Sequence, residues 1–88
     1  MIGNFASPLA GHDAEKIYVV VGEESGRVML ADGNGKTLAN PKRKNRKHIL
    51  FLQDKVSPKL EEMIRNNAKG CDEMIKQELR GYLKGKKA

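Results

Sequence analysis

The sequence predicts a mainly β domain with a C-terminal α-helical part. Short runs of β-branched and aromatic residues, separated by turns that contain glycine, occupy residues 5–52, and this pattern is typical of short strands. From residue 57 onward the spacing of apolar residues changes from two to about three and a half, which is the period of a helix. A chain of 88 residues is expected to form one domain, or a small domain with an appendage, in which nearly every apolar residue contributes to burial.

The central strands are expected to form an antiparallel meander. Ile17–Val21 is a β-branched and aromatic run that ends at Gly22, and Arg27–Ala31 follows after a short turn, so the two runs are expected to pair as a hairpin. Asp32–Gly35 predicts a second turn, because glycine and asparagine tolerate the positive φ of tight turns. Thr37–Ala39 is then expected to return as a third antiparallel strand.

Two further strands are expected to complete the sheet. Phe5-Ala6 upstream and Ile49–Leu52 downstream each add one, which gives about five short strands within roughly fifty residues. This size favours a small SH3-like barrel over an open sheet. Because Ile17–Val21 does not alternate apolar with polar residues, we expect another layer to cover its outer face.

The covering layer is expected to consist of one or two helices. Ser57 is placed to cap a first helix of about three turns that begins at Pro58 and stops at Gly70. Asp72 is expected to cap a second helix. The apolar stripes of the two helices are formed by Leu60, Met63, Ile64 and Ala68 and by Ile75, Leu79, Tyr82 and Leu83. Gly81 and Gly85 each cost about 1 kcal/mol relative to alanine, so the end of the second helix is expected to fray.

These stripes are expected to pack on Tyr18, Val20 and Met29 of the same chain. Leaving either apolar surface in water would forfeit about 25 cal/mol per Å² of stabilisation. We therefore predict a barrel over residues 1–54 and a helical extension over residues 55–88 that packs on it. A groove or dimer face for a partner helix is the alternative, since methionine-rich surfaces suit such contacts. A monomer is the simpler expectation.

Residues 41–48 carry the strongest functional signal. They read Pro-Lys-Arg-Lys-Asn-Arg-Lys-His, with five positive charges and no negative one, and they lead directly into the apolar run Ile49–Leu52. A polyanion would relieve the mutual repulsion of these charges. A solvated loop or a nuclear-import tag is the alternative, but a tag normally lies in a disordered tail. The predicted nucleic-acid contacts are Lys42, Arg43, Lys44, Asn45, Arg46, Lys47 and His48.

Several short motifs in residues 2–52 form a familiar series, made up of Gly3, Phe5, Ser7, Ala10-Gly11-His12-Asp13, Lys16, Tyr18–Val21, Asp32-Gly33, Pro41–Lys44 and Lys47-His48-Ile49. The series resembles the KOW-domain RNA-binding proteins, and in particular the bacterial relatives of the archaeal and eukaryotic large-subunit ribosomal family of the fourteen-e type. The resemblance implies an SH3-like barrel that contacts structured, typically ribosomal, RNA without catalysis. It adds His12 and Lys16 to the predicted RNA contacts. Glu15 departs from the family, which has glycine at that position.

The charge distribution agrees with an RNA partner. Residues 1–40 contain three Lys/Arg and five Asp/Glu, whereas residues 41–88 contain fourteen and six, so the positive field belongs to the second half. Because the chain has no tryptophan and only four other aromatic residues, we expect recognition of RNA shape and phosphates rather than of base sequence.

The competing hypothesis is a protein-interaction module that acts on transcription or translation proteins, with Glu23-Glu24 beside an apolar strand as its contact.

The sequence argues against an enzyme. His12 and Asp13 are chain neighbours with little reason to act as a base and its orienting group, and Cys71 has no base placed beside it. One cysteine and two distant histidines give no metal-ligand spacing, and no glycine-rich loop of nucleotide-binding form is present, so no cofactor is expected. A single cysteine, no membrane-spanning run and no secretory signal pattern together predict a cytoplasmic protein.

Overall fold

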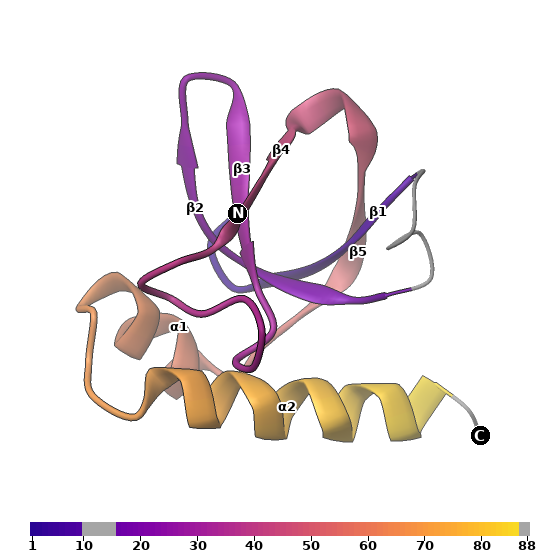
Figure 1. Cartoon of the computed structure of the whole chain (residues 1–88). Helices are drawn as coiled ribbons and strands as arrows, with labels where there is room; N and C mark the ends of the chain where they lie inside the picture. Colours follow the sequence, from indigo (N-terminus) through magenta and orange to yellow (C-terminus); the bar gives the residue numbers. More distant parts are fainter. Residues whose placement is uncertain (10–15, 87–88) are drawn as a thin grey trace.

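The computed structural model describes residues 1–9 and 16–86. The described chain has five strands, a short 3-10 turn and two helices in the order β1 (Asn4–Pro8), β2 (Tyr18–Glu24), β3 (Arg27–Ala31), β4 (Lys42–Asn45), η1 (Arg46–His48), β5 (Ile49–Lys55), α1 (Pro58–Arg65) and α2 (Cys71–Lys86). Figure 1 shows the strands above and the two helices below them. The predicted class, mainly β with a C-terminal α part, is confirmed.

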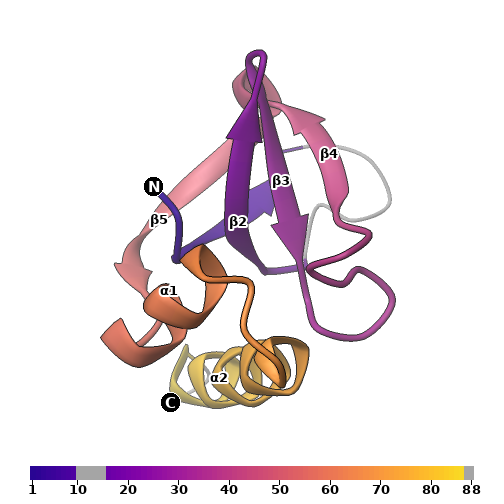
Figure 2. The ribbon, with the colours of Figure 1, turned by 90° about the vertical axis from the view of Figure 1, so that its left-hand side faces the viewer.

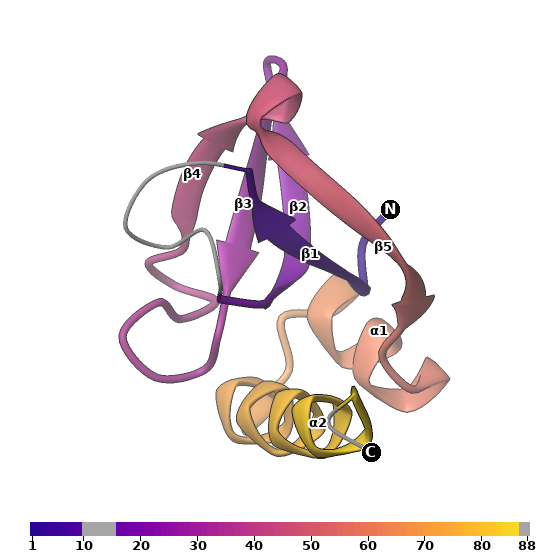
Figure 3. The same ribbon diagram turned by 90° about the vertical axis from the view of Figure 1, so that its right-hand side faces the viewer.

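The strands form one antiparallel sheet in the order β4-β3-β2-β1-β5. It is strongly curved, so that η1 and β5 come back over β1 (Figure 3). The two edge strands, β4 and β5, are not paired with each other in the described part of the chain. The number of strands in the described chain agrees with the prediction, and four of them lie near the predicted positions, but the closure of a barrel is not confirmed.

Both faces of strand β2 are buried, and they belong to two separate cores. Val19 and Val21 face the helices, in a core whose other members include Leu60 of α1 and Ile75 of α2. Tyr18 and Val20 face the opposite way, into the concave side of the sheet, with Ala6, Val28, Leu30 and Ile49. The helices cover the sheet of the same chain, as the unbroken apolar run predicts.

The prediction that the helices pack on Tyr18 and Val20 is wrong, because both side chains belong to the concave core. Met29 packs against the core that contains the helices. Side chains alternate between the two faces of a strand, so Val19 and Val21 take the helix side and Tyr18 and Val20 the other. Because Ile17–Val21 is apolar on both faces, its sequence does not indicate which side chains face the helices and which face the concave side of the sheet.

The predicted strand at Thr37–Ala39 is wrong, because this segment is a loop held against α2. One carboxylate oxygen of Asp32 accepts hydrogen bonds from the backbone N–H groups of Asn34 and Lys36, each at 2.9 Å. The N–H of Leu38 donates to Asp72 of α2 at 2.7 Å. These bonds use backbone groups that a strand would need, and Lys42–Asn45 pairs with β3 instead.

Helix α1 begins as predicted and ends earlier. The side chain of Ser57 caps it by accepting a hydrogen bond from the N–H of Leu60 at 3.2 Å, and Pro58 occupies the first turn. The helix stops at Arg65, after about two turns, because Asn67 takes a left-handed conformation with φ of 51°. Gly70 instead lies immediately before α2, with φ of 80°.

Helix α2 differs from its prediction at both ends. It begins at Cys71, so Asp72 lies in its first turn rather than at the cap, where its carboxylate binds the loop as described above. It continues through Gly81 and Gly85 to Lys86. Two further side-chain contacts bind it to the rest of the described chain. The ring of Tyr82 stacks on Phe5 of β1 with centroids 4.1 Å apart, and the Glu78 carboxylate accepts from the N–H and the hydroxyl of Ser57.

Gly33 is the position at which the loop approaches α2 most closely. Its φ is 80°, and a Cβ there would lie 2.2 Å from the backbone oxygen of Asp72 and 2.9 Å from the backbone nitrogen of Lys76. Gly26 has nearly the same φ, 79°, but a Cβ there would meet nothing within 4 Å. An alanine at Gly26 would therefore meet backbone strain alone, whereas an alanine at Gly33 would meet backbone strain and a steric clash with α2.

We predict that Gly33→Ala lowers the free energy of unfolding by about 3 kcal/mol and Gly26→Ala by about 1 kcal/mol. Both variants pay for an alanine in the left-handed region, and only Gly33→Ala also forces the loop from the helix. Urea unfolding of the two variants beside the parent measures the difference. Equal losses would show that the loop does not pack on α2.

Candidate nucleic-acid interface

The basic run lies on the edge strand β4 and on the turn η1 that follows it. Each residue of β4 is paired with one of β3, in the register Lys42 with Leu30, Arg43 with Met29, Lys44 with Val28 and Asn45 with Arg27. Figure 2 shows β4 at the edge of the sheet, at the end of the molecule away from α2. RNA contact was expected through a basic loop, but Lys42–Asn45 form a strand and only Arg46–His48 form a turn.

Strand geometry divides the charges of β4 between two faces of the sheet. Val28 and Leu30 are buried in the concave core, so Lys44 and Lys42 lie at its rim, where both are half-buried. Lysine suits such a position because its aliphatic stem can cover apolar surface. Arg43 lies on the other face and is exposed. Charges that point along both faces also discourage pairing of this edge with another strand.

The turn η1 holds its three residues outward. The side-chain oxygen of Asn45 accepts a hydrogen bond from the N–H of Lys47 at 2.9 Å and so caps the turn. The N–H of Arg46 donates to the backbone oxygen of Gly26 in the β2-β3 turn at 3.2 Å. Arg46, Lys47 and His48 are all exposed. The local backbone is thus fixed by hydrogen bonds while the basic side chains remain at the surface.

Arg46 forms an ion pair within the described chain. Its guanidinium lies 2.7 Å from a carboxylate oxygen of Glu23, and both side chains are about half exposed, at 54% and 42%. The same guanidinium lies 5.6 Å from the centre of the Phe51 ring, a distance that allows a cation–π interaction. Exposed ion pairs of this kind contribute little to stability, so Glu23 competes for Arg46 rather than holding it permanently.

Three further cations of the basic run have no acidic side chain in contact among the described residues. Within residues 1–9 and 16–86, Arg43, Lys44 and Lys47 form no ion pair. Arg43 lines a shallow groove of about 470 Å³ with Arg27, Glu24, Ser25 and Met29. Sequence reasoning missed Arg27, because its place beside Arg43 follows only from the pairing of β4 with β3. We define the basic edge as Arg27, Arg43, Lys44, Arg46 and Lys47.

The remaining predicted contact residues lie in different places. His48 is exposed at the end of η1, and Asn45 uses its side-chain oxygen for the cap. Lys16 is exposed and lines a separate cleft beside α2. His12 and Glu15 lie outside the described residues, so the RNA contact of His12 stays a prediction.

Cys71 and the possible metal-ligating side chains of the described residues are arranged as follows. Cys71 is buried, and its burial, together with the neighbouring Asp72 carboxylate, raises the pKa of its thiol, which disfavours the reactive thiolate. No group of three or more His, Cys, Asp or Glu side chains is placed to share a metal ion in the part of the chain described.

Comparison with known proteins adds no assignment. The sequence matches no protein-family model, and no curated protein matches it. Over residues 1–9 and 16–86, neither helix has the length and apolar character needed to pass through a bilayer. The resemblance to KOW-domain proteins therefore stays a proposal, and the argument for a function depends on the geometry of the basic edge.

We predict that Asn45→Ala lowers the free energy of unfolding by about 1 kcal/mol, because the variant loses the oxygen that caps η1. Asn45→Asp is the matched control, since it keeps an oxygen that can accept from the N–H of Lys47 and is expected to retain most of the stability. Thermal unfolding at one ionic strength compares them. An alanine variant as stable as the parent would mean that the cap does not shape the turn.

Proposed function

We propose that this chain is a non-catalytic RNA-binding protein that contacts structured RNA, and that its partner is ribosomal RNA in the cytoplasm. The single observation that carries this proposal is the basic edge: several cations that form no ion pair within residues 1–9 and 16–86 lie on a paired strand and a hydrogen-bonded turn. A rigid array of cations loses less conformational entropy on meeting a polyanion than a flexible tail does. Membership of the KOW-domain family is part of the same proposal.

Arginine and lysine have different parts in this mechanism. A guanidinium donates two parallel hydrogen bonds to a phosphate, whereas an ammonium acts as a compact charge. Arg43, exposed beside Arg27, therefore sets the orientation of the RNA backbone, and Lys44 and Lys47 add affinity. Arg46 joins them when a phosphate replaces the Glu23 carboxylate. The exchange costs little because the pair is exposed to solvent.

The basic edge recognises phosphate and shape, since it has no aromatic surface on which a base could stack. The four aromatic residues of the chain are all described, and each is engaged elsewhere. Phe5 and Tyr82 stack on each other, Tyr18 is buried in the concave core, and Phe51 is half-buried within reach of Arg46. Readers of single-stranded sequence depend on exposed aromatic platforms.

A second candidate function is a protein-interaction module. Leu9 and Leu50 are exposed at 55% and 51%. They lie near each other, because Ser7 pairs with Leu50 and the N–H of Leu9 donates to His48. An apolar pair beside the basic turn suits a contact with a neighbouring protein. Capture of a partner that survives nuclease digestion would favour this function, and loss of all partners on digestion would favour RNA.

We predict that the double variant Arg43→Ala with Lys47→Ala binds ribosomal RNA more weakly. Its log association constant should also fall less steeply with log salt concentration, by about 1.5 in slope, because each lost phosphate contact removes about 0.7 to 0.9 from the magnitude of the slope. Filter binding over a salt series measures both effects. The matched control is Lys59→Ala with Lys69→Ala. It removes the same charge from exposed positions in the helical part of the molecule and is expected to keep the parent slope. Equal slopes in the two double variants would contradict the proposal.

We also predict that Glu23→Gln strengthens RNA binding by about threefold, since it removes the carboxylate that competes for Arg46, and exposed pairs are worth about 0.2 to 1 kcal/mol. Glu62→Gln, an exposed carboxylate of α1, is the control for a general change of charge. If both variants bind alike, Arg46 does not exchange Glu23 for phosphate.

A further inference from the structure

A second cleft lies at the opposite end of the molecule from the basic edge, between α2, the start of β2 and the loop after β3. Its volume is about 420 Å³, within the range of small-ligand pockets. It is lined by Lys16, Ile17, Tyr18, Asp32, Asn34, Lys76, Leu79, Arg80 and Leu83. The proposed function makes no use of it.

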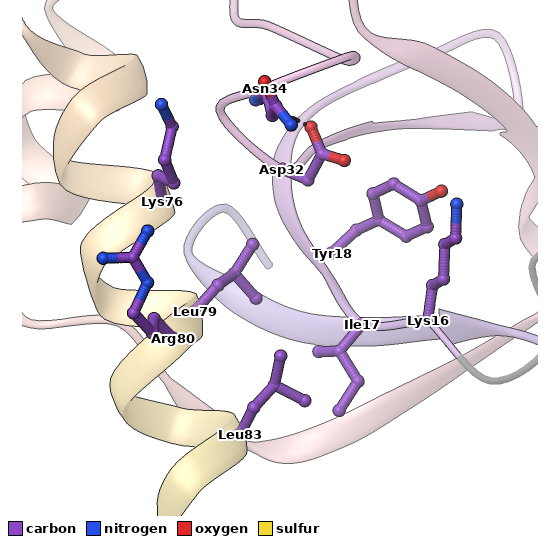
Figure 4. A pocket seen from close by; sticks show the side chains of 9 residues that line it. All are labelled: Lys16, Ile17, Tyr18, Asp32, Asn34, Lys76, Leu79, Arg80 and Leu83. Carbon is purple, nitrogen blue, oxygen red and sulfur yellow. Dashed lines mark hydrogen bonds between the residues drawn. The ribbon is translucent and has the colours of Figure 1, made fainter.

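The floor of this cleft is apolar. Leu79 and Leu83 project from α2 toward Ile17 (Figure 4). Leu79 is almost fully buried, whereas Leu83 is 40% exposed although it lies on the side of the helix that carries the buried stripe. The three side chains make an apolar surface, and covering Leu83 would remove apolar area from water.

The walls of the cleft are polar, and their charge is mainly positive. Lys76 and Arg80 are four residues apart on α2, so they lie on one side of the helix. Lys76 is 3.6 Å from Glu73, whereas Arg80 forms no ion pair with any described residue. Across the cleft, Asp32 has one carboxylate oxygen bound to two N–H groups of its own turn, and Asn34 offers an exposed side-chain amide.

We propose that this cleft binds one unpaired nucleotide of the RNA partner. Arg80 and Lys76 take the phosphate, the base lies on Ile17, Leu79 and Leu83, and Asn34 faces the edge of the base. A phosphate alone would leave the apolar floor uncovered, and an apolar ligand alone would leave the guanidinium without an anion. A ligand that joins a flat ring to an anionic group satisfies both surfaces. Unpaired bases held between apolar side chains are a recurring mode of RNA recognition.

The inference rests on the proposed function for the source of the nucleotide, and it adds a second point of attachment. The basic edge and α2 lie at opposite ends of the molecule (Figure 1), whose longest dimension is 36 Å. An RNA whose fold presents phosphates to the basic edge and an unpaired residue to the cleft would engage both. Binding at one end would raise the effective concentration at the other.

The test is an NMR titration of the full chain with each of the four nucleoside 5′-monophosphates, with inorganic phosphate and with the nucleosides. We expect a monophosphate to shift the amide signals of Ile17, Asn34 and Arg80 in a saturable way. We expect inorganic phosphate and the nucleosides to bind at least about tenfold more weakly, because each lacks one half of the contact. Phosphate that binds as well as every nucleotide, or no saturable shift at the cleft, would overturn the proposal.

Variants make the test specific. Arg80→Ala and Leu83→Ser change exposed side chains and are each expected to weaken monophosphate binding by about tenfold. Lys84→Ala is the matched control, because Lys84 is exposed on α2 and does not line the cleft. A Lys84 variant that loses as much affinity as Arg80→Ala would show a general charge effect and contradict the site.

Failure of this inference can be distinguished from failure of the proposed function. Arg43→Ala with Lys47→Ala alters only the basic edge, so it is expected to leave the monophosphate titration unchanged. If those two replacements abolish the cleft shifts, the nucleotide binds at the basic edge and the inference is wrong. If the cleft binds nucleotides while the basic edge contributes nothing to RNA affinity, the proposed function of the basic edge is wrong and the cleft is still a nucleotide-binding site.

Discussion

The burial of both faces of β2 is the constraint on which the rest of the structure depends. Tyr18–Val21 are all buried, so the chain must build a layer on each side of one strand. The curved sheet encloses Tyr18 and Val20 on its concave side, and the two helices cover Val19 and Val21 on the other. Because the helices are committed to that face, β4 and η1 remain at the edge, with their basic side chains open to a partner.

The basic edge is held in place although its own sequence disfavours a strand. Lysine and asparagine are depleted in strands, and like charges in neighbouring positions repel one another. Pairing with β3 and the capped turn at Asn45 supply the order that this sequence lacks. Residues whose local preference opposes the fold are expected mainly at functional positions. A polyanion that neutralises Arg43, Lys44 and Lys47 would relieve the repulsion between these charges.

Sequence reasoning found what depends on local pattern and missed what depends on tertiary pairing. β3, the start of α1 at Pro58 and the need for a covering layer all follow from periodicity and turn chemistry. The strand expected at Thr37–Ala39 was displaced by hydrogen bonds to Asp72, which lies 34 residues away in the chain. At the basic edge, composition identified the cations. The ion pair of Arg46 with Glu23 and the division of the β4 side chains between two faces could not be predicted, because both depend on how β4 and η1 align with β2 and β3.

The central claim is that the basic edge meets RNA in the cell. Ultraviolet crosslinking in cells, followed by sequencing of the attached RNA and mass spectrometry of the attached peptide, tests it most directly. The account predicts one enriched region of ribosomal RNA, joined to a peptide that contains residues 42–48. Recovery of protein partners alone, or of RNA joined only to other parts of the chain, would contradict it.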